Sequence, residues 1–165
     1  METTAPAAAA PNASYLFVLK LTDIPGGMEV IAATFAHRGV SIASSVGNDG
    51  LLDPAGRATV LVTFSATPAK KEIIRRALMR LSRVHLVTEH AMDSGSLRKT
   101  AVFRMQGYGS MEHRMATFLE RIAHDPETGD ITYLYVDTPA KVDSVLRDLR
   151  TTNRLLDVAT SVIGL

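Results

Sequence analysis

The chain repeats one segment of its own sequence, and this internal repeat constrains the fold more than any other feature. Residues 26–38 (GGMEVIAATFAHR) align with residues 109–121 (GSMEHRMATFLER), with seven of thirteen pairs identical. Residues 67–70 (TPAK) recur as residues 138–141. The first pair lies 83 positions apart and the second 71, so the second copy has lost 12 residues between its two motifs. Such self-similarity predicts one supersecondary unit built twice.

The first copy begins with a strand followed by a helix. Residues 15–21 (YLFVLKL) form an apolar run that is typical of a buried strand. A Pro-Gly-Gly turn then leads into a helix with apolar residues at helical spacing, and Gly39 is a plausible C-terminal cap. Further strands are predicted at residues 41–46, 58–64 and 85–89, with a turn-rich loop at residues 47–56.

The TPAK motif predicts the start of the second helix. Thr67 can cap that helix, and Pro68 fits its first position, where a missing N–H costs nothing. The resulting order is βαββαβ, with two helices on one face of a four-stranded antiparallel sheet. We therefore predict an α+β fold of ferredoxin-like units. The apolar stripe of the second helix consists of Ile73, Ile74, Ala77, Leu78 and Leu81.

The second copy predicts the same unit with one strand missing. The 12 lost residues fall where the first copy has its second strand and loop, so we expect a shorter sheet with an open edge for pairing with another chain. The expected elements are strands at residues 100–105, 131–136 and 155–163, a helix at residues 110–124 and a helix after Thr138.

The repeat also sets the expected domain boundaries. The Ala- and Pro-rich residues 1–14 contain no basic residue, which predicts a disordered tail and not a secretory signal. Two domains are expected at residues 15–93 and 97–165, joined near residues 93–96 (DSGS).

Composition excludes several classes of protein. Lys and Arg total 18 against 17 Asp and Glu, a balance that argues against nucleic-acid and membrane-surface partners. The chain has no cysteine, which removes disulfides and thiolate nucleophiles and suits a cytoplasmic location. No apolar run approaches the roughly 20 residues of a membrane-spanning helix.

The best candidate for a ligand site is the turn between the first strand and the first helix. Its glycines allow a ligand to approach the backbone closely. The N–H groups and the dipole at a helix start favour an anion such as the carboxylate of a free amino acid. An ordinary tight strand-to-helix turn is the alternative. The residues of this turn are Asp23, Ile24, Pro25, Gly26, Gly27 and Met28.

This turn and residues 38–42 (RGVSI) together resemble an ACT domain, an amino-acid-sensing module of metabolic enzymes. Residues 106–109 (QGYG) and 162–165 (VIGL) are similar to the C-terminal domain of the acetolactate synthase (acetohydroxyacid synthase) small, regulatory subunit. The resemblance is collinear from about Tyr15 to the last residue.

The resemblance implies a non-catalytic regulatory subunit that forms a cytoplasmic homodimer with its ACT sheets paired edge to edge. It implies that a branched-chain amino acid, usually valine, binds at the interface through the turn together with Ser41 and Ile42. It also implies activation of a large catalytic subunit that carries thiamine diphosphate, magnesium and FAD. None of these cofactors is expected on this chain.

Two departures from the family bear on the effector. Members of the family commonly carry Asn at the positions of Asp23 and Ser41. A negative charge at Asp23 would repel a ligand carboxylate, although it could instead hold the ammonium group, and a mispaired charge in a pocket can cost several kcal/mol. We expect valine sensing to be weakened, lost or retuned.

The loop at residues 47–56 (GNDGLLDPAG) is absent from the second copy. Its Leu51 and Leu52 either fold back on the core or, together with Asp53 and Arg57, contact the catalytic subunit as the matching loop does in the family. The basic side chains of the second predicted helix have two interpretations as well: a solvated face or a docking surface for an acidic partner.

Residues that could carry catalysis or bind a metal are scattered. His85 and His90 would point to opposite faces of a strand and cannot share a metal, and no nucleophile–base pair stands out. A free-standing ACT sensor for a different enzyme or regulator remains an alternative. An enzyme on a ferredoxin-like sheet, such as a cofactor-free oxygenase, would need a polar cluster for which the apolar stripes leave little room.

Overall fold

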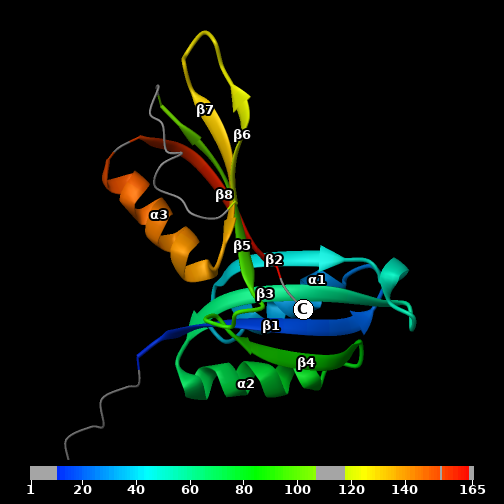
Figure 1. Cartoon of the computed structure of the whole chain (residues 1–165). Coiled ribbons are helices and arrows are strands. Elements are labelled where there is room, and N and C mark those ends of the chain that lie inside the picture. Colours follow the sequence, from blue (N-terminus) through cyan, green and yellow to red (C-terminus); the bar gives the residue numbers. More distant parts are fainter. Residues whose placement is uncertain (1–10, 107–117, 153, 164–165) are drawn as a thin grey trace, which may run out of the picture. The chain divides into compact units, whose positions relative to one another are not determined.

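The computed structural model describes residues 11–106, 118–152 and 154–163 and, of Leu52, the backbone alone. The chain divides into two compact units, unit 1 (Met1–His90) and unit 2 (Ala91–Leu165). Each unit is built on its own four-stranded antiparallel sheet (Figure 1). Two ferredoxin-like α+β units in tandem were predicted from the repeat, and this architecture is confirmed.

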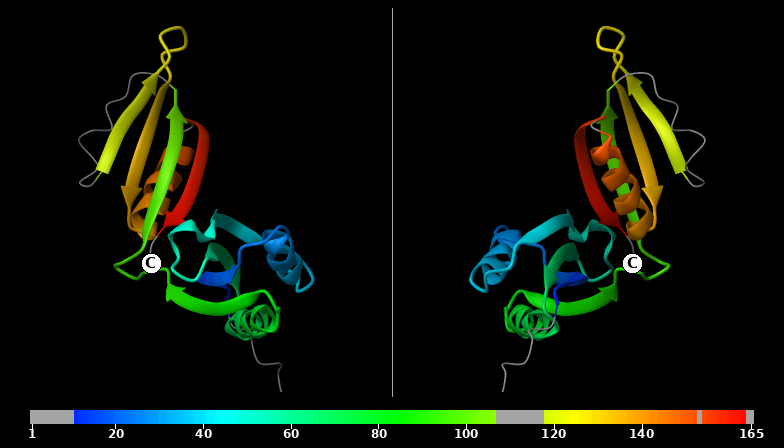
Figure 2. Two further views of the ribbon diagram at one scale, coloured as in Figure 1. Left: turned by 90° about the vertical axis from the view of Figure 1, so that its right-hand side faces the viewer. Right: turned by 90° about the vertical axis from the view of Figure 1, so that its left-hand side faces the viewer.

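Unit 1 has the predicted βαββαβ order. Its strands form sheet A in the order β2-β3-β1-β4, and both helices lie on one side of the strands (Figure 2). The elements are β1 (Ala13–Thr22), α1 (Gly27–Ala36), β2 (Ile42–Asn48), the 3₁₀ turn η1 (Gly50–Leu52), β3 (Arg57–Ala66), α2 (Pro68–Met79) and β4 (Val84–Ala91).

The core of unit 1 lies between sheet A and its helices. Strand alternation directs every second side chain of β1 and β3 toward α1 and α2. Phe64 of β3 makes edge-on ring contacts at 4.9 Å between centroids with both Phe17 of β1 and Phe35 of α1. Ile74 and Leu78 of α2 are fully buried against the same cluster.

Strand β1 begins earlier than the sequence predicts. Ala13 and Ser14 pair with Ala66 and Ser65 of β3, so the last two residues of the predicted tail belong to sheet A. Residues 1–10 of that tail lie outside the described residues.

Unit 2 places four strands in sheet B, in the order β6-β7-β5-β8. Helix α3 covers one face (Figure 1), and Phe103, Tyr133 and Val142 are buried between the helix and the sheet. The elements are β5 (Arg98–Met105), β6 (Phe118–His124), β7 (Ile131–Asp137), α3 (Pro139–Thr151) and β8 (Leu155–Ile163).

The expectation that the second sheet lacks a strand is wrong. Residues 118–124, predicted as the end of a helix, form β6 and pair antiparallel with β7. Leu119 lies opposite Tyr135 and packs on the core, so strand pairing and burial override the helical pattern. The chain is shortened instead between β5 and β6, where residues 106–117 replace the longer connection of residues 23–41. The rest of the predicted helix, residues 110–117, lies outside the described residues.

The repeated TPAK motif begins a helix in both units, as predicted. The Thr67 hydroxyl accepts a hydrogen bond of 3.3 Å from the Lys70 N–H, and Pro68 is the first residue of α2. In unit 2, Pro139 is the first residue of α3. Among the described residues, no helix has both the length and the apolar character needed to cross a membrane.

Candidate functional site

A pocket of about 310 Å³ lies at the turn between β1 and α1, a volume at the low end of the range for small-molecule sites. We call it the turn pocket. The end of β1, the first turn of α1, the end of β2 and the start of β3 enclose it. Five of the eight residues predicted to bind an effector line it: Asp23, Ile24, Gly26, Gly27 and Met28.

The start of α1 faces this pocket through bare backbone. Gly26 caps the helix with φ of 84°, a left-handed conformation that favours glycine, and no described side chain caps the first turn. The first N–H groups of α1 are therefore available to a ligand. A Cβ atom on Gly27 would lie 2.7 Å from Cδ1 of Leu21, so glycine also permits the close packing of helix on strand.

The charged lining of the turn pocket is acidic. Asp23, Glu29 and Asp49 all line it. Asp23 Oδ2 accepts a hydrogen bond of 2.9 Å from the Gly50 N–H, and Asp49 Oδ1 accepts one of 3.2 Å from the Leu51 N–H. The Asp23 carboxylate thus ties the β1–α1 turn to the loop after β2. The three carboxylates favour an ammonium group, whereas the helix start favours an anion, so the lining is complementary to a zwitterion.

Arg83 supports the turn from the chain segment after α2. Its Nη1 donates a hydrogen bond of 3.1 Å to the carbonyl oxygen of Pro25, and its own carbonyl accepts one of 2.9 Å from the Thr22 N–H. The sequence does not single out Arg83 for this role, because a contact across 58 positions leaves no local signal.

Ser41 and Ile42 lie away from the turn pocket. They line a second pocket of about 410 Å³ with Phe35 and Gly39, at the C-terminal end of α1. A helix of ten residues is about 15 Å long, so one copy of the chain does not bring all eight predicted effector residues together.

The loop after β2 leaves Leu51 at the surface. Leu51 is 84% exposed, so of its two alternatives the one in which it folds back on the core is excluded. The side chain of Leu52 lies outside the described part of the chain. Glycine is required at the base of this loop, because a Cβ atom on Gly50 would collide with the carbonyl oxygen of Gly56.

Asp53, predicted to contact a partner, holds the loop together. Its side chain is 7% exposed and forms ion pairs of 3.2 Å with both Lys20 and Arg57. A backbone hydrogen bond from the Ala55 N–H, then the Arg57 and Lys20 side chains, hold the pKa of Asp53 well below its usual range. Arg57 is part of this internal network although its side chain is 40% exposed, and Leu51 is the most exposed of the described side chains in the predicted contact set.

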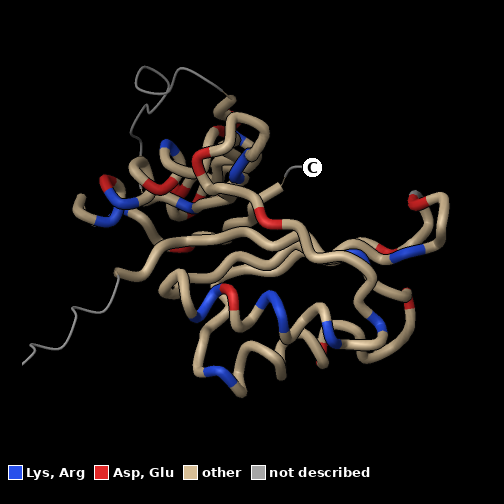
Figure 3. Tube along the Cα trace, turned by 90° about the horizontal axis from the view of Figure 1, so that it is seen from below, with Lys and Arg blue, Asp and Glu red and all other residues tan. Residues whose placement is uncertain are grey.

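The basic side chains of α2 are partly neutralised within unit 1. Glu72 pairs with Arg75 at 2.8 Å and with Arg76 at 3.0 Å, and these two hydrogen-bonded arginines lower the pKa of Glu72 to about 2. Lys71 pairs with Glu89 of β4 at 2.7 Å. Acidic and basic residues are interspersed in both units (Figure 3), which favours the interpretation of α2 as a solvated face.

The residues described by the structure contain no group of three or more His, Cys, Asp or Glu side chains placed to hold a metal ion. The polar groups of the turn pocket are carboxylates and backbone amides, which bind and orient a ligand. The geometry therefore describes a pocket on a tandem ferredoxin-like fold.

Comparison with solved structures agrees with this fold. The chain is similar to the small subunit of acetolactate synthase from Thermotoga maritima, with a TM-score of 0.70 and 16% identity over 93% of this chain and 96% of that one. The regulatory subunit of aspartate kinase from Thermus thermophilus gives a TM-score of 0.43 and 12% identity over 88% of this chain and 98% of that one. No family model and no curated protein matches the sequence.

Proposed function

We propose that the chain is a regulatory subunit that binds and activates a thiamine-diphosphate-dependent catalytic subunit of acetolactate synthase type. The observation that carries the proposal is the fold, shared along nearly the whole chain with the Thermotoga maritima small subunit. The chain contributes no catalytic residue, and thiamine diphosphate, magnesium and FAD belong to the partner. Regulation follows when the subunit binds the active state of its partner better than the inactive state.

The proposed effector is a small amino acid in the turn pocket. Its carboxylate would accept hydrogen bonds from the first N–H groups of α1, close to the Asp23 and Glu29 carboxylates that repel it, and its ammonium group would face the third carboxylate of the lining, Asp49. The excess of carboxylates in the lining supports an affinity for valine that is weakened relative to a pocket with Asn at position 23.

The same proposal includes a homodimer. Ser41 and Ile42 lie at the far end of α1 from the turn pocket of their own copy. A second copy, paired with sheet A along an edge strand, would bring its own Ser41 and Ile42 to complete the site.

The effector site is tested by calorimetric titration with valine of two matched variants, Asp23→Asn and Glu29→Gln. Each removes one carboxylate charge from the turn pocket, but only Asp23 is bonded to the Gly50 N–H. A repulsion of about 1 kcal/mol, the Coulomb energy at about 4 Å in water, corresponds to about fivefold tighter binding in each variant. Micromolar binding by the unaltered chain, or unchanged affinity in both variants, would contradict weakened sensing.

The partner role is tested by adding the purified chain to an acetolactate synthase catalytic subunit supplied with thiamine diphosphate, magnesium and FAD. We expect an increase in the rate of carboligation, and we expect Leu51→Ser to abolish it while the dimer stays folded. Ile73→Ser is the control, because Ile73 is also an exposed apolar residue of unit 1, on α2.

Amino-acid binding without any effect on the catalytic subunit would contradict the proposed activation of an acetolactate synthase partner. It would identify the chain as a free-standing ACT sensor. Equal loss of activation in Leu51→Ser and Ile73→Ser would remove the loop from the contact.

A further inference from the structure

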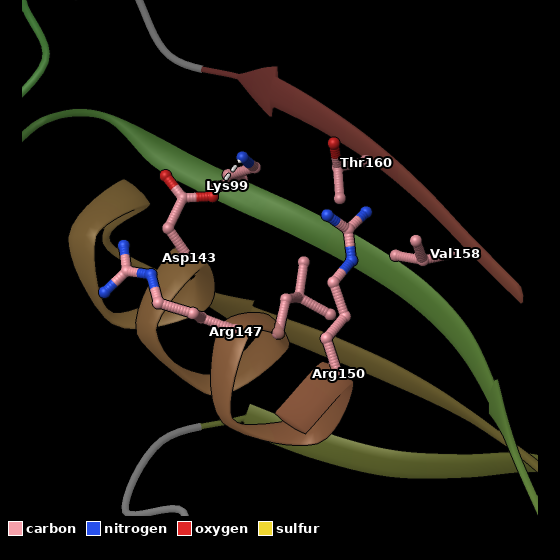
Figure 4. A pocket seen from close by; sticks show the side chains of 7 residues that line it. Lys99, Asp143, Arg147, Arg150, Val158 and Thr160 are labelled. Carbon is pink, nitrogen blue, oxygen red and sulfur yellow. Dashed lines mark hydrogen bonds and ion pairs between the residues drawn. The ribbon is translucent and has the colours of Figure 1, made fainter. Parts of the chain in front are cut away.

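Unit 2 contains a pocket of its own, on the helix-covered face of sheet B. It has a volume of about 420 Å³ and lies between α3, β5 and β8 (Figure 4). We call it the α3 pocket. Residues of all three elements line it, and none of them is among the residues that the sequence singles out for function.

The charges of the α3 pocket are predominantly positive. Lys99, Arg147 and Arg150 line it together with one acid, Asp143. Lys99 Nζ pairs with Asp143 Oδ1 at 2.5 Å, so the charges of these two side chains offset each other. The two arginines then leave an excess of two positive charges.

Neither the Arg147 nor the Arg150 side chain forms a hydrogen bond or ion pair with another residue in the described part of the chain. On α2 of unit 1, by contrast, Arg75 and Arg76 share the carboxylate of Glu72. The arginines of the α3 pocket therefore keep their donors available to an external anion.

The side chains of the α3 pocket suit a ligand with an anionic end and an apolar end. Arg150 extends from α3 across the pocket toward β8, which carries Thr160 (Figure 4). A guanidinium presents a planar fork of donors that suits a carboxylate or a phosphate, and a hydroxyl can add a further donor. Leu146 and Val158 supply an apolar wall.

We propose that the α3 pocket is a second ligand site, which binds a small aliphatic carboxylate. The carboxylate group lies on Arg150 and Thr160, and a short branched hydrocarbon packs on Leu146 and Val158. The apolar wall favours this ligand over inorganic phosphate, which has no apolar part. The site is independent of the effector proposed for the turn pocket, whose lining has the opposite charge.

The test is a titration of the full chain with isovalerate, acetate and inorganic phosphate in turn, followed by NMR of the methyl groups and backbone amides. We expect isovalerate to shift the methyl signals of Leu146 and Val158 and the amide signal of Thr160. Acetate should bind at the same place more weakly, because it lacks the branched chain. Added salt should weaken binding of both anions through screening.

Two matched variants locate the anion. Arg150→Gln should weaken isovalerate binding about tenfold, the factor that corresponds to a loss of about 1.4 kcal/mol. Arg80→Gln, the same change at an exposed residue of unit 1, should leave it unchanged. Both arginines are exposed, so circular dichroism should show that both variants fold.

The proposal is overturned if isovalerate leaves the signals of the α3 pocket unmoved, or if Arg150→Gln and Arg80→Gln bind it equally. Binding of phosphate as tight as that of isovalerate would also overturn it, because the apolar wall would then contribute nothing. Each result leaves the activation of a catalytic subunit untouched, so the two proposals fail separately.

Discussion

The two units share a fold and differ in the charge of their pockets. The turn pocket of unit 1 is lined by the carboxylates of Asp23, Glu29 and Asp49 and by the bare start of α1. The α3 pocket of unit 2 is lined by Arg147 and Arg150 with a neutral Lys–Asp pair. The fold positions a pocket, and the residues on its loops and helix faces decide which ligand fits it. The repeated fold therefore carries two pockets of opposite charge.

The largest expected effect tests whether the two units depend on equivalent cores. Phe17 of β1 and Phe103 of β5 are both buried in the central strands of their sheets. Phe17→Ala and Phe103→Ala should each lower the free energy of unfolding by about 3–5 kcal/mol through lost burial and a residual cavity. Hydrogen exchange should show lost amide protection in the unit that carries the substitution. Equal loss in both units from either change would contradict two separate cores.

The next effect concerns a glycine that unit 1 needs for its loop. Gly50→Ala places a Cβ atom against the Gly56 carbonyl and displaces the N–H group that donates a hydrogen bond to Asp23. We expect this substitution to lower the free energy of unfolding by about 1–3 kcal/mol. Gly95→Ala is the matched control, because its Cβ would meet no atom within 4 Å. Urea unfolding of both variants measures the difference, and equal stability would mean that the loop adjusts freely.

A smaller effect on stability is expected from Arg83, which supports the turn that lines the turn pocket. Arg83→Gln removes the hydrogen bond to the Pro25 carbonyl, for a loss of about 0.5–1.5 kcal/mol. Arg80→Gln, at an exposed position, should change stability by less than about 0.5 kcal/mol. Thermal unfolding of the pair measures the contribution of this support. No difference between them would show that the turn holds its shape without Arg83.

The smallest expected effect is a loss of stability of unit 2 at alkaline pH. Burial, then a hydrogen bond of 3.1 Å from its hydroxyl to Asp137, raise the pKa of Tyr135 to about 12. The unfolded chain releases this proton near pH 10, so the stabilising contribution is complete below about pH 10 and is lost as the pH rises through about 12. An ultraviolet pH titration of the chain should show one late tyrosinate transition, and the same titration of Tyr135→Phe should lack it. A transition near pH 10 for Tyr135 would contradict the assignment.

Local chemistry explains which elements could be predicted from the sequence. Thr67 with Pro68 begins a helix because a cap and a proline act within a few residues, and the same motif behaves alike before α3. Strand β6 does not follow the predicted helix because its structure depends on pairing with β7 and on packing against the core, and the helical spacing of its apolar residues records neither.

The candidate site likewise combines features that local sequence predicts with features that depend on tertiary contacts. The glycines of the turn predicted a pocket at the start of α1, and the structure places one there. The separation of Ser41 from that pocket, the inward position of Asp53 and the support from Arg83 depend on contacts between distant segments. The α3 pocket combines residues of α3, β5 and β8 and left no motif in the sequence.

The most direct test of the central claim is an amide NMR titration of the full chain with valine. The account predicts that the Gly27, Met28 and Gly50 N–H signals shift together and saturate at a concentration above the micromolar range. A titration to high valine concentration that leaves these three amides unmoved would contradict an amino-acid site at the β1–α1 turn.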